Sequence, residues 1–366
     1  MKVIHRTTAY AAWVLIVASC WPAVTRAQGA SPNVTEFSTG LNNPRGLKFG
    51  PDGFLYVAEG GTGGDLSTVG TCGQVPSPVG PYTGGFTGRI SKIDSQGNRT
   101  TVADHLLSSQ TSPAIGSLVS GVADVAFIGN TLYALLAGAA CSHGLQGTTN
   151  GIIRVNADGS TTLIADLSAF QKAHPVANPE PGDFEPDGTW YSMVAVRGKL
   201  YAVEPNHGEL DVVAPNGQIS RIADISASQG HIVPTSVAYH GNFYVGNLNT
   251  FPITPGSSKV LKITPSGQIH TVDTGFTTIL GVAFDHESFM YVLENTTVAG
   301  MPTPFTGKVV RVKDNGVEEI ATGLFLPSAM TFGPDRALYV SNVGFGPPAS
   351  GGGQVVRITV PPVAGE

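Results

Sequence analysis

A short pattern of apolar residues around a tyrosine recurs six times along the chain. The repeated segments place their tyrosines at Tyr56, Tyr133, Tyr201, Tyr244, Tyr291 and Tyr339. The last three intervals are 43, 47 and 48 residues, which matches the period of a four-stranded propeller blade. The first two intervals are longer, so we interpret them as the same unit with insertions.

The neighbours of each tyrosine segment repeat as well. A short apolar strand precedes it across a tight turn such as 50–53 or 240–242, and a third strand follows it. Asp158-Gly159 or Asn216-Gly217 then leads to a fourth strand, and such dipeptides favour two-residue hairpin turns. Each repeat therefore predicts four antiparallel strands, here called A to D.

The ends of the chain complete the count of strands. The chain stops after the sixth C strand, and the N-terminal segment 36–41 resembles the D strand at 319–324. A D strand supplied by the N-terminus would remove the open edge of the last blade. The pattern thus predicts an all-β, six-bladed β-propeller, with blades at about 42–105, 122–167, 190–226, 234–275, 279–324, and 327–360 plus 33–41.

Composition and charge exclude several classes of function. Only 13% of the 366 residues are charged, the net charge is −6, and no basic run follows residue 30. Nucleic-acid binding needs clustered Lys and Arg, so it is excluded. No apolar run after residue 27 approaches the roughly 20 residues of a membrane helix. We expect a monomer whose partner is a small molecule or an extracytoplasmic protein.

The N-terminus resembles an export signal, with Lys2 and Arg6 before an apolar run and small residues up to Ala27. Cleavage there would leave 28–366 as one domain. Residues 17–20 also resemble a lipobox, which would lipidate Cys20 and tether the protein to a membrane. Either interpretation places the protein in the periplasm or outside the cell. In that compartment we expect Cys72 and Cys141, in equivalent loops of adjacent repeats, to form a disulfide.

The insertions gather on one face of the predicted propeller. The A–B and C–D turns are short, whereas the B–C loops and D–A crossovers are long. The long segments are 60–87, 138–150, 248–257, 295–306 and 343–353 among the B–C loops, and 106–121, 168–190 and 226–234 among the crossovers. Functional loops commonly collect this way on a rigid scaffold, so we place the site at this mouth of the central channel.

Polar residues end most of the B strands at that mouth. The six positions are Glu59, Leu136, Glu204, Asn247, Glu294 and Asn342. One interpretation is that these side chains cap backbone N–H groups of the neighbouring loops. The other is a ring of oxygen ligands for a polar ligand or a cation such as Ca²⁺.

A second candidate metal site lies in the longest crossover. Asp183, Glu185 and Asp187 alternate and are followed by Gly188, as in the first half of a calcium loop. The bidentate Glu of that motif is absent, because Val194 stands at its position. A simple turn is therefore the alternative interpretation.

The candidate acid–base groups are histidines near the third blade. His207 and His231 flank this blade, as does Trp190, a candidate binding residue. No pair of histidines has zinc-ligand spacing, and no Gly-x-Ser-x-Gly elbow occurs. A catalytic residue is therefore not assigned.

Several segments resemble the ScyD/ScyE-type family of exported propellers, which is named for scytonemin biosynthesis and is similar to NHL and gluconolactonase-like propellers. The resemblance spans about 36–360 and is strongest in 40–47, 50–59, 233–238, 244–248 and 251–252. It implies an extracytoplasmic accessory role in assembling an indole–phenol pigment, without assigned catalytic residues. The chain departs from the family's pattern at 185–191 and 203–208, so its ligand specificity is in doubt.

Two other classes stay open. Gluconolactonase-like enzymes are calcium-dependent and carry Glu, Asn and Asp at the start of A strands. The matching positions here are Arg45, Ala123, Ser192, Thr235, Leu280 and Ser328, which include no carboxylate. The third class is a pure binding module that presents loops 60–87 and 168–190 to a protein or a glycan.

Overall fold

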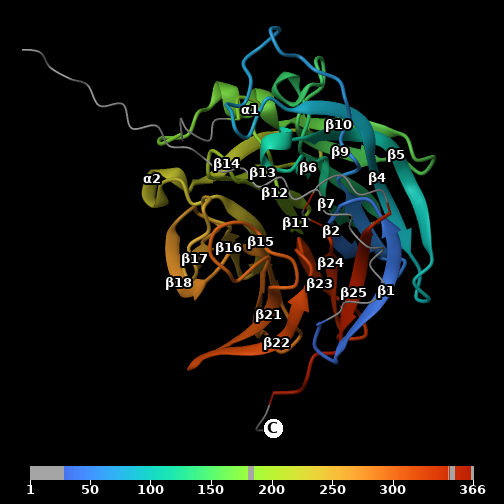
Figure 1. Ribbon diagram of the computed structural model, residues 1–366, viewed down its shortest axis with the longest axis vertical. Coiled ribbons are helices and arrows are strands. Elements are labelled where there is room, and N and C mark those ends of the chain that lie inside the picture. The colour runs from blue at the N-terminus through green and yellow to red at the C-terminus, as the bar shows by residue number, and fades with distance from the viewer. Residues whose placement is uncertain (1–28, 180–184, 345, 347–350, 364–366) are drawn as a thin grey trace, which may run out of the picture.

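The computed structural model describes residues 29–179, 185–344, 346 and 351–363, and it shows six antiparallel sheets arranged as a β-propeller (Figure 1). This confirms the predicted fold class. Blades two to five each contain four strands in chain order. They are β7 (Val122–Ile128), β8 (Thr131–Leu136), β9 (Gly151–Val155) and β10 (Thr161–Asp166); β11 (Ser192–Val196), β12 (Lys199–Glu204), β13 (Glu209–Val213) and β14 (Ile219–Asp224); β15 (Pro234–His240), β16 (Asn242–Asn247), β17 (Ser258–Ile263) and β18 (Ile269–Phe276); and β19 (Ile279–Phe284), β20 (Met290–Glu294), β21 (Gly307–Lys313) and β22 (Gly316–Leu324).

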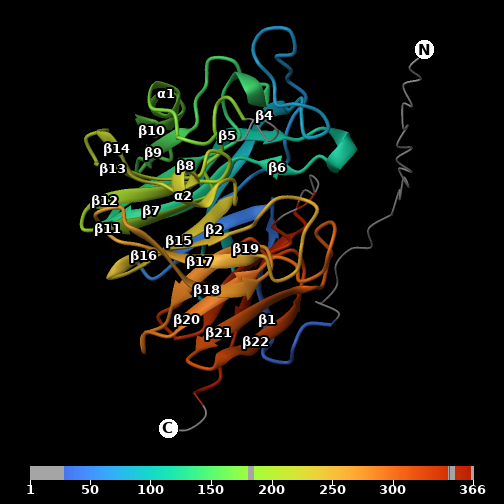
Figure 2. The ribbon, with the colours of Figure 1, turned by 90° about the vertical axis from the view of Figure 1, so that its left-hand side faces the viewer.

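The last blade is closed by the N-terminus, as predicted. It contains β23 (Ala329–Phe332), β24 (Leu338–Asn342), β25 (Gly353–Ile358) and β1 (Val34–Leu41). β1 pairs with β25 from Val34 opposite Ile358 to Leu41 opposite Gly353, so blue and red strands lie side by side in Figure 1. Figure 2 shows the blades from another side, as successive sheets that change colour in chain order.

The first blade extends beyond its predicted bounds. It contains β2 (Pro44–Phe49), β3 (Leu55–Glu59), β4 (Thr83–Ile93), β5 (Arg99–Gln110) and the additional β6 (Val119–Ser120). Part of the segment expected to be a loop therefore continues the β4–β5 hairpin. The register of this hairpin shifts at Gly88, where a side chain would collide with the backbone of Leu107, so glycine permits the bulge.

The repeated tyrosine has a structural role that explains its period. In four of the six blades its ring packs edge-to-face against a phenylalanine at or near the end of the A strand of the next blade. Tyr56 contacts Phe127 in this way, and Tyr339 of the last blade contacts Phe49 of the first, which closes the ring of blades. The Tyr56 hydroxyl also donates a hydrogen bond of 2.8 Å to Asp52 in the A–B turn.

The few helices lie in connections at the loop-rich face. They are α1 (Leu167–Ala173), α2 (Ser226–Gln229) and the 3₁₀ turns Pro113–Ile115 and Cys141–His143. In the described part of the chain, no helix is long and apolar enough to cross a membrane. The predicted export signal, including Cys20, lies outside the described residues.

Candidate functional site

The polar residues at the B-strand ends are buried and bonded to protein backbone. Four of them accept a backbone N–H from the crossover that enters the A strand of the same blade. The pairs are Glu59 with Asn42 (2.6 Å), Glu204 with Thr189 (2.9 Å), Glu294 with Thr277 (2.6 Å) and Asn342 with Phe325 (2.8 Å). Asn247 instead donates to the Ile232 carbonyl in its crossover at 2.8 Å. In five of the six blades these residues therefore connect the crossover to the B strand, as the capping interpretation expects.

Glu204 has further partners. Its second carboxylate oxygen accepts the His207 backbone N–H at 2.6 Å and lies 3.6 Å from the His207 ring. Burial raises the pKa of Glu204, but the hydrogen bond and charge of His207 outweigh it and lower the pKa overall. Burial lowers the pKa of His207, and Glu204 reverses this and raises it overall. His207 is thus the partner of a buried carboxylate.

The two described acids of the candidate calcium loop also contact protein groups, and Asp183 lies outside the described residues. Asp187 accepts from the backbone N–H and hydroxyl of Ser142 at 2.8 and 2.7 Å and pairs with Lys172. Burial raises the pKa of Asp187, but these hydrogen bonds lower it overall. Glu185 accepts the Tyr82 hydroxyl at 2.6 Å. Among the described residues, no three His, Cys, Asp or Glu side chains form a group that could hold a metal ion.

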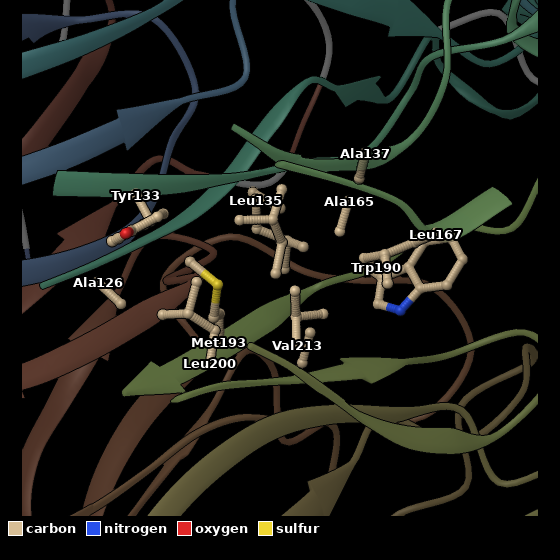
Figure 3. Close-up of a cluster of buried hydrophobic side chains, with 13 residues drawn as sticks. Ala126, Tyr133, Leu135, Ala137, Ala165, Leu167, Trp190, Met193, Leu200 and Val213 are labelled. Atoms are coloured by element: carbon tan, nitrogen blue, oxygen red, sulfur yellow. The ribbon is translucent and has the colours of Figure 1, made fainter. Parts of the chain in front are cut away.

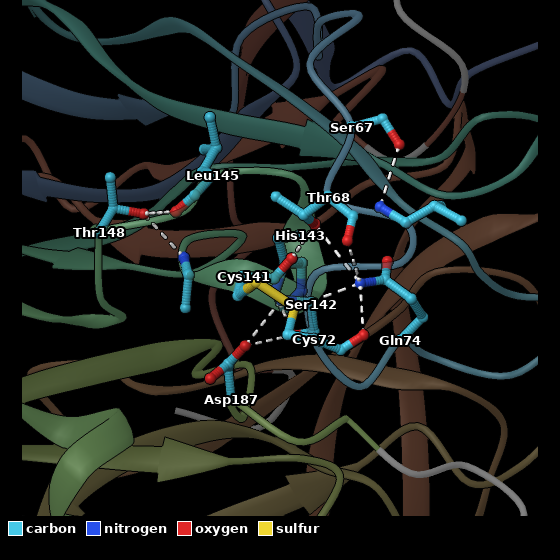
Figure 4. Close-up of a disulfide and its surroundings, with 12 residues drawn as sticks. Ser67, Thr68, Cys72, Gln74, Cys141, Ser142, His143, Leu145, Thr148 and Asp187 are labelled. Carbon is cyan, nitrogen blue, oxygen red and sulfur yellow. Dashed lines mark hydrogen bonds between the residues drawn. A yellow bond between two sulfur atoms is a disulfide. The ribbon is translucent and has the colours of Figure 1, made fainter.

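The predicted disulfide is present. Cys72 and Cys141 are joined, with their Cα atoms 6.3 Å apart, and the bridge ties the long loop of the first blade to the matching loop of the second (Figure 4). Ser142 follows the bridge and donates to Asp187, as the dashed lines in Figure 4 show. The disulfide therefore fixes the loop against which the third-blade crossover rests.

A cavity of about 800 Å³ opens among the long loops of the first four blades. Of the residues predicted as ligand or metal sites, Trp190, His231 and Glu185 line it. Glu59, Glu204, His207, Asn247, Glu294, Asn342 and Asp187 do not. Sequence analysis assigned no site role to several other lining residues, which include Arg45, Tyr82, Tyr191, Asn206 and Phe251. The lining segments are B–C loops, D–A crossovers and the starts of A strands.

Part of the cavity lining comes from the starts of A strands. Arg45, Ala123, Thr235 and Leu280 all line it, and these are four of the positions aligned above with the lactonase ligands. The alignment with the lactonase ligand positions could therefore have identified these four lining residues from the sequence. The Arg45 guanidinium lies 5.8 Å from the centre of the Tyr191 ring, and burial raises the pKa of the Tyr191 hydroxyl. A fixed cation therefore stands at one of the positions where the lactonase pattern has metal ligands.

Trp190 forms a wall of the cavity and belongs to the apolar core between the second and third blades. Figure 3 shows its indole beside Leu167, in a cluster that includes Leu135 and Leu200. Its Nε1–H points at a carboxylate oxygen of Asp211, 3.4 Å away. Burial and the neighbouring Glu209 charge raise the pKa of Asp211 well above its ordinary value. The tryptophan is thus held rigidly by packing.

Comparison of the sequence with family models and with curated proteins finds no match. Solved structures with the same fold include a proposed oxidoreductase, described as a glucose dehydrogenase, from Thermus thermophilus (17% identity, TM-score 0.55, covering 89% of this chain and 99% of that one). A gluconolactonase from Xanthomonas campestris (10%, 0.51, 90% and 89%) and a luciferin-regenerating enzyme (11%, 0.52, 89% and 94%) are also similar. At these identities the likeness establishes the propeller fold alone.

Proposed function

We propose that this propeller binds a small, largely apolar and planar molecule in the cavity at its channel mouth. The supporting observation is the lining of that cavity. Four aromatic residues, Trp190, Tyr191, Tyr82 and Phe251, line it, and its volume suits a small organic ligand. Aromatic walls with a few polar groups favour a flat apolar body whose orientation the polar groups select.

The residues that set the choice of ligand lie in the two segments that depart from the ScyD/ScyE pattern. Glu185, Trp190 and Tyr191 come from the first, and Pro205 and Asn206 from the second. Because both segments line the cavity, we infer that the ligand differs from that of typical members of the family. We also propose that the protein is exported and has an accessory role in secondary metabolism. The described disulfide is compatible with an oxidising compartment.

A fluorescence experiment tests the cavity site directly. The three tryptophans are Trp13, Trp21 and Trp190, so a chain of residues 28–366 contains only the one in the cavity wall. Anilinonaphthalene sulfonate, a flat dye that binds apolar cavities, should then show emission sensitised by Trp190 with a saturable, one-site titration. A variant in which Phe251 becomes Ala should weaken the dye's affinity.

The matched control is Leu163→Ala, since Leu163 is an exposed apolar residue of β10 that does not line the cavity. It should leave the titration unchanged. Linear, unsaturable sensitisation, or an equal loss of affinity in both variants, would contradict the proposed site. Export is tested separately, by fractionating cells: a protein found only in the cytoplasm would refute that part of the proposal.

A further inference from the structure

The described residues of the cavity wall include one arginine and one acid. Arg45, at the start of β2, and Glu185, in the crossover before β11, both line the cavity. Glu185 is 4% exposed, and its oxygens face protein groups: one accepts from Tyr82, and the other lies 3.4 Å from the His143 ring. Arg45 is therefore the fixed charge that the wall can offer to a ligand.

The contacts of Arg45 place its guanidinium at the cavity wall. The guanidinium donates to the Val119 carbonyl and lies 5.8 Å from the centre of the Tyr191 ring. Both Val119 and Tyr191 line the same cavity. A guanidinium carries five N–H donors in a planar fork, so it can bind a carboxylate through two parallel hydrogen bonds while it keeps other contacts.

Tyr191 holds this cation close to the central channel. Tyr191 precedes β11 of the third blade, and its hydroxyl donates to the carbonyl of Ser328, just before β23 of the sixth blade, at 3.1 Å. Because these two blades are opposite each other in the ring of six, a contact between them crosses the channel. Arg45 of the first blade lies over the same ring, so its charge stands where the mouth loops meet.

The acid nearest to this arrangement in the second blade is engaged by backbone groups. Asp124 of β7 lies near enough to Tyr191 to influence its hydroxyl. Its carboxylate accepts the backbone N–H groups of Val125 and Met193 at 2.8 and 2.7 Å. Burial raises the pKa of Asp124, which favours its neutral form and reduces the negative charge close to the cation of the cavity.

We propose that the cavity selects aromatic carboxylates, whose carboxylate binds the Arg45 guanidinium while the flat body lies among the apolar residues of the wall. The proposal rests on the proposed function and specifies the charge of the ligand. A charge-assisted, bidentate pair is stronger than a neutral hydrogen bond. Arg45 is therefore the residue that decides which flat molecules bind.

Three probes with one naphthalene frame separate the effect of charge from that of shape. 2-Naphthoate is an anion at neutral pH, 2-naphthamide is neutral and of nearly the same shape, and 2-naphthylmethylamine is a cation. By isothermal titration calorimetry on the purified protein, the carboxylate should bind about tenfold more tightly than the amide. The cation should bind most weakly.

Substitutions at Arg45 assign this preference to its charge. Arg45→Met should remove the difference between the carboxylate and the amide and should strengthen the binding of the cation. Arg45→Lys keeps the charge without the planar fork and should retain part of the preference. Lys199→Met is the matched control, because it removes one exposed positive charge from the A–B turn of the third blade, outside the cavity. It should preserve the order of the three probes.

Thermal melting establishes that each variant is folded, and comparing the probes on one variant cancels any general loss of affinity. Equal binding of the carboxylate and the amide by the wild type, or tightest binding of the cation, would overturn the proposed selectivity and leave the apolar cavity site intact. A wild-type preference in Arg45→Met, or in Arg45→Lys no preference at all, would overturn the role of Arg45. Failure of every probe to bind the wild type would overturn both proposals.

Discussion

Replacing Glu204, which does not itself line the cavity, by alanine should strongly destabilise the propeller. The fully buried carboxylate accepts the backbone N–H groups of Thr189 and His207. Hydrogen bonds to a charged group contribute about 1.5–3 kcal/mol each, and both partly buried amides would lose their acceptor. We therefore expect a loss of about 3–5 kcal/mol, which for a domain of this size lowers Tm by roughly 4–7 °C.

The measurement is thermal unfolding followed by circular dichroism, together with chemical denaturation. Glu204→Gln keeps one acceptor oxygen, so its Tm should lie between those of the alanine variant and the wild type. Glu319→Ala is the matched control, because that side chain is 61% exposed and its pairing with Lys308 is a surface contact. A wild-type Tm for Glu204→Ala, combined with lost ligand binding, would refute the structural role and support the oxygen-ligand interpretation.

Three further predictions concern charge and covalent closure. His207 has a raised pKa in the folded state, so its stabilising contribution is complete below about pH 6.5 and is lost at higher pH. The Tm of His207→Ala should therefore decrease less than that of the wild type when it is measured from pH 6.5 upward. Asp211 has a pKa raised well above its ordinary value, so the Tm of Asp211→Asn should rise relative to wild type as pH increases from 4 to 8, and a constant difference would contradict this. Replacing Cys72 and Cys141 by serine removes a bridge between residues 69 apart in sequence. This should lower the free energy of unfolding by up to about 4 kcal/mol. An unchanged midpoint of chemical denaturation would contradict this prediction.

The fold could be predicted from the sequence because the blade repeats a physical unit. Tyr56 and its five equivalents recur because each occupies the same place in its blade, and several pack against the aromatic that ends the next A strand. The matching of 36–41 to a D strand worked for a related reason, since β1 pairs with β25 as a D strand pairs with its C strand. Contacts that recur in successive blades require similar residues at a regular interval in the sequence. The disulfide could be predicted from the same alignment of repeats.

The site could be predicted only in part, because its residues do not repeat. The period located the ends of B strands, but not where their side chains point, and Glu59 and Glu294 bond to crossovers of their own blades. Glu185 was assigned to a metal on the spacing of three acids, whereas its partner is Tyr82, a residue 103 positions away. Such pairing depends on how two long loops meet, which no local pattern records.

The architecture separates the residues that hold the propeller together from those that line the cavity. The B-strand carboxylates and amides are engaged by crossovers, so changing them alters the scaffold. The loop residues Asn206 and Phe251 line the cavity without belonging to a sheet, so changing them should alter ligand choice at little cost in stability. Arg45 has both roles, because it lies at the start of an A strand, lines the cavity and donates to the Val119 carbonyl. Substitution of Arg45 should therefore impair both stability and binding, whereas a change confined to Asn206 should affect binding alone.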